Sequence, residues 1–320
     1  MVEEKMKKKI QNSGLTRRSF LKTSAAFAST AMFAGAGAST LFGSSNTAAV
    51  KRSIKEVTLN NGVKMPILGF GTLYLTGSVG ERCISDAIKH GYRLIDTATI
   101  YNNEDAVGAG IKLSGIERKE LFVTSKVWVD DSGYENTKRA FETSLEKLGL
   151  DYLDLYLIHR PRGDVKGSWK AMEELYRENM IRAIGVSNFE PHHLDELLSD
   201  SDVVPTVNQI EAHAFFQQPE DLEYLNQHNI QMEAWSPFAQ GRNNHFTNEI
   251  LAQIGNKYNK TNAQVSLRWH YQRGIVTIPR TSQEAHMVEN LNIFDFELTE
   301  SDMNTISGLD LNTTQFPEWD

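Results

Sequence analysis

Short apolar runs alternate with amphipathic stretches through most of this chain, and the alternation predicts its fold. Strands that alternate with helices along a chain are typical of βαβ units and of a parallel sheet. Eight strands with helices between them predict an α/β protein, a closed (β/α)8 TIM barrel. The expected strands cover residues 67–71, 94–96, 122–126, 155–159, 183–186, 207–210, 231–235 and 276–278.

A β-hairpin is expected ahead of the barrel, because residues 57–65 place an Asn-Gly turn between two short alternating runs. We expect this hairpin to plug the bottom of the barrel. No low-complexity linker follows, so residues 51–320 are predicted to form a single barrel domain. A short polar tail, residues 311–320, carries two aromatic side chains. It either folds over the open end of the barrel and touches substrate, or frays as chain ends commonly do.

The first 50 residues differ in kind from the rest. A basic head leads to the motif TRRSFLK at residues 16–22, and no charged residue occurs from 23 to 50. This segment resembles a twin-arginine export signal with a spacer. Cleavage after 36–38 or after 47–49 fits equally well, and an uncleaved membrane anchor is the alternative, since the uncharged stretch exceeds the ~18 residues that span a bilayer. We therefore expect export by the twin-arginine machinery to the periplasm or cell envelope.

The composition of the chain limits the classes of molecule that it is expected to bind. The formal net charge is −8, and removal of the basic leader would make the remaining chain more acidic still, which argues against binding to nucleic acid. Cys83 is the single cysteine, so no internal disulfide can form, and we expect it to pack as a small apolar residue on the first helix. A small-molecule ligand and a monomeric enzyme are the expectation.

Four residues with titratable side chains lie where predicted strands end in loops. In βα-barrels the active site lies at these strand ends. Asp96, Lys126 and His159 end three successive apolar runs, and Tyr101 follows the first of them. Each has an ordinary structural explanation when taken alone: a helix cap, a solvated strand end or a core histidine. Together they are the residue types that a carbonyl reductase needs.

The chemistry follows from ordinary pKa values. A tyrosine hydroxyl titrates near ~10, too high for easy proton exchange at neutral pH. A buried Lys126 ammonium, held by the Asp96 carboxylate, is expected to favour the phenolate of Tyr101 and so to lower its pKa. His159 is then free to hydrogen-bond the substrate oxygen and fix its angle.

Three segments resemble the signatures of the aldo-keto reductases, in particular the prokaryotic diketogluconate-reductase-like branch. Residues 91–98, followed by Glu104 and Gly108, resemble the first signature. Residues 172–189 resemble the second, and 278–290 resemble the third with one departure. The resemblance covers nearly the whole chain after the leader. It implies an NADPH-dependent oxidoreductase that reduces an aldehyde or ketone to an alcohol.

The resemblance also implies roles for individual residues. Tyr101 would be the proton donor, Lys126 and Asp96 its tuning pair, and His159 the group that orients the carbonyl. Trp235 would stack on the nicotinamide ring and fix the face that delivers hydride. Helix capping and core packing are the alternatives for the cofactor contacts. The expected cofactor-binding residues are Ser187, Asn188, Gln209, Trp235, Ser236, Arg280, Thr281, His286, Glu289 and Asn290.

The departure in the third signature concerns charge. The family usually has an arginine at the position of His286, beside the adenosine 2′-phosphate. An imidazole with an unperturbed pKa near ~6.5 offers that phosphate less charge at neutral pH than a guanidinium does. Arg280 can still bind phosphate through two hydrogen bonds. We therefore expect NADPH to bind, with NADH more competitive than is usual in the family.

The substrate is less well defined by the sequence. Tyr74, Trp128 and Arg160 each follow a strand end near the four catalytic candidates and are the expected substrate-binding residues. Arg160 or Arg162 would favour acidic or polyhydroxylated carbonyl compounds, although both fit equally well as surface loop residues. A cofactor-binding redox-sensing subunit with little turnover is the alternative function.

A metal site is not expected. His192 and His193 are adjacent in the sequence, so they are predicted to lie on different sides of a helix, unlike an i,i+4 pair of metal ligands. A metal-dependent hydrolase on the same barrel would also need clustered His and carboxylate ligands at its strand ends, and the sequence lacks them.

Overall fold

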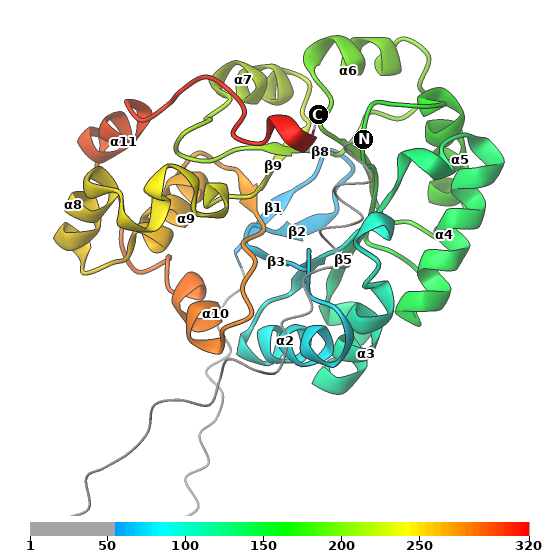
Figure 1. The fold of residues 1–320 in the computed structure, drawn as a ribbon. Helices are drawn as coiled ribbons and strands as arrows, with labels where there is room; N and C mark the ends of the chain where they lie inside the picture. Colours follow the sequence, from blue (N-terminus) through cyan, green and yellow to red (C-terminus); the bar gives the residue numbers. More distant parts are fainter. Residues whose placement is uncertain (1–54, 320) are drawn as a thin grey trace, which may run out of the picture. The chain divides into compact units, whose positions relative to one another are not determined.

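A computed structural model describes residues 55–319, so the predicted export signal lies outside the described residues. Eight parallel strands follow one another around a barrel in chain order, and a bridge between Leu68 and Thr277 joins the last strand to the first (Figure 1). This confirms the predicted (β/α)8 barrel. The strands are β3 (Gly69–Gly71), β4 (Leu94–Asp96), β5 (Phe122–Val127), β6 (Leu155–Ile158), β7 (Ile184–Ser187), β8 (Val207–Glu211), β9 (Gln231–Trp235) and β10 (Val276–Thr277).

Helices surround the strands as an outer ring (Figure 1). The apolar faces of these helices form one cluster with the outward-facing strand residues, and Cys83 of the first helix belongs to it as expected. Within residues 55–319, no helix is long and apolar enough to span a membrane. The helices are α2 (Gly77–His90), α3 (Glu104–Ser114), α4 (Tyr134–Leu148), α5 (Val165–Arg177), α6 (Pro191–Leu198), α7 (Pro219–Gln227), α8 (Glu249–Tyr258), α9 (Asn262–Gln272), α10 (Glu284–Leu291) and α11 (Glu300–Ser307).

The predicted hairpin is present and closes the barrel from below. Its strands β1 (Glu56–Thr58) and β2 (Lys64–Pro66) pair antiparallel. Asn60 and Asn61 donate side-chain hydrogen bonds of 3.0 Å to the backbone just before β8 and β7, respectively. Met65 packs into the apolar cluster of the barrel interior. The hairpin therefore covers the N-terminal ends of the strands, and the active site is expected at their C-terminal ends.

The barrel interior changes character along its axis. Side chains alternate between the two faces of a strand, so Leu94 and Asp96 of β4 share the inner face, as do Phe122 and Lys126 of β5. Leu94 and Phe122 belong to the apolar cluster near the hairpin, whereas Asp96 and Lys126 are buried polar groups further along. An apolar floor thus supports a polar layer near the C-terminal ends of the strands.

Gly108 allows α3 to lie against the end of α4. A Cβ atom at this position would collide with the backbone carbonyl of Leu148, and no flexible side chain could move to relieve the contact. We expect Gly108→Ala to lower the free energy of unfolding by about 2 kcal/mol or more, a typical cost of overpacking. Urea denaturation would measure it. Gly308→Ala is the matched control, since its Cβ would meet only the Thr305 carbonyl oxygen at 3.4 Å; an equal loss in both variants would contradict the steric explanation.

Candidate active site

A buried ion pair lies at the top of the barrel interior. Lys126 Nζ is 2.7 Å from Asp96 Oδ1 and donates a second hydrogen bond of 2.8 Å to the carbonyl oxygen of Thr97. Both side chains are almost fully buried. The parallel register of β4 and β5 produces this contact, because Asp96 pairs with Thr124 and Lys126 stands two residues further along on the same face.

Tyr101 and His159 complete the cluster. Tyr101 ends a short 3₁₀ turn after β4, and the Lys126 ammonium lies 5.1 Å from the centre of its ring. The His159 ring meets the Tyr101 ring edge to face at 5.7 Å, and Trp128 packs on His159 at 5.0 Å. The structure therefore brings together all four residues that the sequence singled out, with Trp128 beside them.

The pKa of Tyr101 shifts in a different direction from the one expected. Burial raises the pKa of Tyr101 and is the largest influence; the Lys126 charge and hydrogen bond lower it, and Asp96 raises it again. Lys126 lowers the pKa of Tyr101 as expected, but burial outweighs it, so the net direction is upward and not downward. Lys126 offsets part of the burial effect only. A tyrosine that keeps its proton at neutral pH is suited to donating that proton to a developing alkoxide.

His159 is uncharged in this environment. Burial holds its pKa well below the usual histidine value, and the charges of Lys126 and Arg160 lower it further. Its Nδ1 atom has no hydrogen-bond partner within the described residues. A neutral imidazole carries one N–H that can donate to a carbonyl oxygen, so the ring can orient a substrate without adding a charge.

The expected nicotinamide contacts form a connected group at the ends of β7, β8 and β9. Trp235 donates from Nε1 to Asn188 Oδ1 at 2.8 Å, and Asn188 donates from Nδ2 to the His159 carbonyl oxygen at 3.0 Å. Ser187 donates to the Gln209 carbonyl oxygen at 2.8 Å. Asn188 has φ +62°, a left-handed backbone that turns its side chain back toward the strand ends. These polar groups fit a carboxamide, which needs both donors and acceptors.

The loop after β9 fits a bound phosphate chain. Ser236 and Gln240 have φ near +50°, and Gly241, Asn243 and Asn244 also lie in the left-handed region. Successive backbone amides in such conformations can converge on an anion. Strained backbone of this kind concentrates at ligand-binding sites. The segment that follows Ser236 therefore has the geometry of a pyrophosphate cradle.

The residues of the third signature fall into two groups, those that a ligand can reach and those that are bonded within the protein. Arg280 and His286 are exposed and available to a ligand, and Thr281 accepts a hydrogen bond from the Gln283 amide at 3.1 Å. Glu289 instead accepts from the Thr261 hydroxyl at 2.6 Å. Asn290 is buried and hydrogen-bonds Tyr92, one of the influences on the pKa of that phenol. The side chains of Glu289 and Asn290 thus also hold α10 to the start of α9 and to the loop after α2.

Two of the three expected substrate residues lie at the catalytic cluster. Trp128 packs on His159 as described, and the Arg160 charge lowers the pKa of both Tyr101 and His159. Tyr74 lies elsewhere, with its ring 5.9 Å from the Arg280 guanidinium. The position of Tyr74 therefore links it to the cofactor end of the site.

The C-terminal tail folds over the open end of the barrel (Figure 1). Phe316 is fully buried, and the rings of Phe316 and Trp319 lie 5.3 and 5.4 Å from Trp235. Glu211, at the end of β8, accepts hydrogen bonds from Thr314 and from the backbone of the next residue. Of the two possibilities left by the sequence, the frayed terminus is wrong. The anchoring role of Glu211 had no signal in the sequence.

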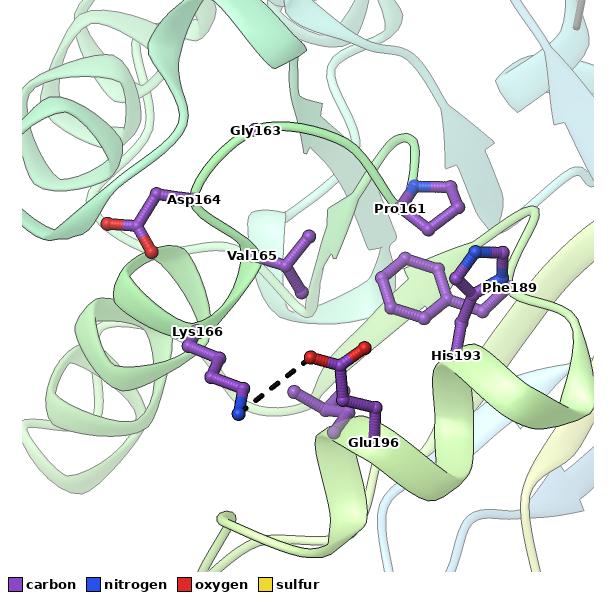
Figure 2. Close-up of a pocket in the computed structure, with 9 residues that line it drawn as sticks. Pro161, Gly163, Asp164, Val165, Lys166, Phe189, His193 and Glu196 are labelled. Carbon is purple, nitrogen blue, oxygen red and sulfur yellow. Dashed lines mark ion pairs between the residues drawn. The ribbon is translucent and has the colours of Figure 1, made fainter.

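A separate hollow of about 310 Å³ lies between the loop after β6 and helix α6 (Figure 2). Pro161, Phe189 and Leu197 contribute apolar surface, and Lys166 pairs with Glu196 at 3.8 Å. The hollow contains none of the four catalytic candidates, so it is not the active site.

Helix α6, beside that hollow, departs from expectation. The rings of His192 and His193 are 3.8 Å apart, so the prediction that they lie on different sides of the helix is wrong. His193 accepts a hydrogen bond from the Glu190 amide in a capping box, which folds its ring back toward its neighbour. One ligand atom from each of Glu190, His192 and His193 lies within 4.8 Å of the others. These side chains are largely exposed, and nothing about their geometry connects them to the catalytic cluster.

Comparison with known proteins agrees with this geometry. A glyoxal reductase of Bacillus subtilis (strain 168) is 54% identical over 260 residues, which cover 80% of this chain and 94% of that protein. A methylglyoxal reductase of Escherichia coli (strain K12) is 39% identical, with coverage of 82% and 96%. An aldo/keto reductase structure from Brucella melitensis has a TM-score of 0.78 and 43% identity, covering 81% of this chain and 100% of that chain.

An aldo-keto reductase structure from Bombyx mori, in complex with NADP, has a TM-score of 0.77 and 32% identity, covering 82% of this chain and 94% of that chain. The profile of the aldo/keto reductase family matches residues 68–311, which is most of the chain. With the barrel and the four clustered side chains in place, the chain belongs to the aldo/keto reductase family and is an NADP(H)-dependent oxidoreductase of carbonyl groups.

Proposed function

We propose that the chain reduces short, oxygen-rich carbonyl compounds, with α-oxoaldehydes such as glyoxal and methylglyoxal as the first candidates. The observation that carries this proposal is the position of Arg160, whose charge acts on both Tyr101 and His159. A cation there favours substrates with a second oxygen next to the reacting carbonyl. The glyoxal and methylglyoxal reductases among the relatives support the same substrate class. We propose a monomer as the working form.

Each catalytic candidate then has a task. NADPH, when bound, would supply the hydride for the carbonyl carbon. Tyr101 donates its proton to the carbonyl oxygen, and neutral His159 donates a hydrogen bond to the same oxygen and fixes its position. Burial lowers the pKa of Lys126, but Asp96 and Tyr101 raise it to a net value above that of an ordinary lysine. Lys126 therefore stays charged and stabilises the phenolate that the reaction leaves on Tyr101.

The cofactor is held along the rim of the barrel. Ser187, Asn188 and Gln209 would bind the nicotinamide carboxamide, and Trp235 would pack against the ring. Ser236 begins the segment that would follow the pyrophosphate. Arg280, Thr281 and His286 would surround the adenosine 2′-phosphate, with Glu289 and Asn290 supporting α10 behind them. His286 stands where the family usually has a second arginine, so the site attracts the 2′-phosphate of NADPH less strongly. NADH would therefore compete with NADPH more effectively than in a site with two guanidinium groups.

A redox-sensing subunit that binds cofactor without turnover is the alternative. Such a protein needs the cofactor contacts but has no need of a buried proton donor. The buried Lys126–Asp96 pair beside a protonated Tyr101 therefore favours an enzyme.

Replacing Tyr101 tests the proposed reaction. Tyr101→Phe removes the proton donor and keeps the ring, so kcat for NADPH-dependent reduction of methylglyoxal should fall by about 10²- to 10⁴-fold, the usual worth of general acid catalysis. The Kd of NADPH should change little. Initial rates and a fluorescence titration would measure the two quantities. A variant that turns over at the wild-type rate would show that another group donates the proton.

Replacing Arg160 tests the substrate class. Arg160→Ala should raise KM for methylglyoxal and for a short keto acid by about tenfold, the value of one charge-assisted hydrogen bond. KM for an unsubstituted aliphatic aldehyde should stay the same. Arg162→Ala is the matched control, because Arg162 is exposed and two residues away in the same loop. Parallel changes for all three substrates would contradict recognition of a second oxygen.

We also propose that the chain is exported in the folded state by the twin-arginine machinery. The TRRSFLK motif supports this proposal, and the twin-arginine route would let NADPH travel inside its binding site. Protein isolated from the cell envelope should then carry about one nicotinamide nucleotide per chain, measured by mass spectrometry after denaturation. Envelope protein consistently free of nucleotide would refute transport of the loaded enzyme, and protein confined to the cytosol would refute export.

A further inference from the structure

A carboxyl group that no signature accounts for lies beside the catalytic cluster. Glu233, in the middle of β9, is fully buried, and its Oε1 atom has no hydrogen-bond partner within residues 55–319. Lys126 is the cation nearby, but its Nζ atom is bonded to Asp96. Burial of a carboxyl group without full hydrogen bonding costs free energy, so its presence here calls for a functional explanation.

Gln209 connects this carboxyl group to the ion pair. Its Nε2 atom donates to Asp96 Oδ2 and to Glu233 Oε2, each at 2.9 Å. Gln209 and Glu233 are direct neighbours in the register of β8 and β9. A continuous hydrogen-bonded chain therefore runs from Glu233 through Gln209 and Asp96 to Lys126, which in turn lies beside Tyr101.

We propose that Glu233 is a positioning residue of the reductase site: it fixes the orientation of the Gln209 amide and adds a second, titratable carboxyl group to the Asp96–Lys126 pair. The inference rests on the proposed role of Gln209 as a nicotinamide contact and extends it to a residue that touches neither cofactor nor substrate.

The orientation follows from hydrogen-bond chemistry. An amide can be turned either way, and its neighbours decide which end faces them. Asp96 Oδ2 and Glu233 Oε2 both accept a hydrogen bond from Gln209 Nε2, so the NH₂ group of the amide is directed at these two oxygens. Its carbonyl oxygen is thereby turned away from the pair and kept as an acceptor for the carboxamide NH₂ of the nicotinamide. With Asp96 alone, one amide hydrogen would lose its partner and the orientation would be less restricted.

The charge of Glu233 changes near pH 8. Burial and the Asp96 charge raise the pKa of Glu233 to about 8, while the Gln209 hydrogen bond and the Lys126 charge pull it down. The groups that face it are Asp96 from β4, Lys126 from β5 and Gln209 from β8. Glu233 is therefore neutral near pH 7, and above pH 8 it adds a negative charge that raises the pKa of Lys126 and helps Tyr101 to keep its proton.

A first experiment separates charge from shape. Glu233→Gln keeps the size and the oxygen acceptor but cannot ionise. We would measure kcat/KM for methylglyoxal reduction as a function of pH in the variant and in wild type. The alkaline loss of activity should move to lower pH by on the order of one unit, because the variant lacks the negative charge that helps to hold the Tyr101 proton. Superimposable pH profiles would overturn the electrostatic part of the inference.

A second measurement on the same variant needs no turnover. The pKa of Glu233 in the folded state lies above the usual carboxyl value, so this group stabilises the fold while protonated and loses that contribution as pH rises toward 8. The Tm of Glu233→Gln relative to wild type should therefore increase between pH 5 and pH 8. A constant difference would show that Glu233 does not titrate in this range. Glu173→Gln is the control, because Glu173 is a buried carboxylate that accepts hydrogen bonds from two backbone amides outside the barrel interior.

A third experiment tests the amide orientation. Glu233→Met removes the second acceptor and keeps an unbranched side chain of similar volume, so the Kd of NADPH should rise by about tenfold. Quenching of tryptophan fluorescence would measure binding without catalysis. Wild-type affinity would overturn the positioning role. Wild-type protein that fails to bind NADPH or to reduce methylglyoxal would instead refute the proposed function, so the two failures are distinguishable.

Discussion

The ion pair between Lys126 and Asp96 is the interaction on which the rest of the site depends. A charge inside a barrel survives only if it is paired and hydrogen-bonded, and removal of one partner from such a pair typically costs about 3–5 kcal/mol. Here the pair is also fixed by the backbone at Thr97 and by the amide of Gln209. The same ammonium that holds Asp96 lies beside Tyr101, so folding of the barrel and preparation of the proton donor require the same contact.

The apolar side chains that stabilise the barrel and the polar side chains of the active site lie at opposite ends of the barrel interior. The hairpin and the apolar side chains near it fill the lower interior. The upper interior can then hold Asp96, Lys126, Gln209 and Glu233 together, since rigid strands fix their positions on all sides. Side chains mounted on strands are positioned more exactly than those on loops, and a shift of about 1 Å in such a cluster is costly for catalysis.

Much of this arrangement could be predicted from the sequence. The strand positions and the four catalytic candidates could be recognised because each is a local signal, an apolar run with a titratable group at its end. The contact of Gln209 with Asp96 could not, because it joins positions 113 residues apart. The sequence reveals the charge of Lys126 but not the burial of Tyr101, and burial decides the direction of its pKa. The close contact between His192 and His193 was missed because a helix N-cap, rather than helical periodicity, sets the position of His193.

The C-terminal tail helps to position the residues of the expected cofactor site, as the ion pair does for the catalytic cluster. Trp235 is fixed on one side by its hydrogen bond to Asn188 and on another by contacts with Phe316 and Trp319. Asn188 in turn holds the backbone of His159. The indole that would contact the nicotinamide and the imidazole that would orient the substrate are therefore linked through one amide. Because these groups already position one another, little binding free energy needs to be spent on ordering them, and more of it remains available for the transition state.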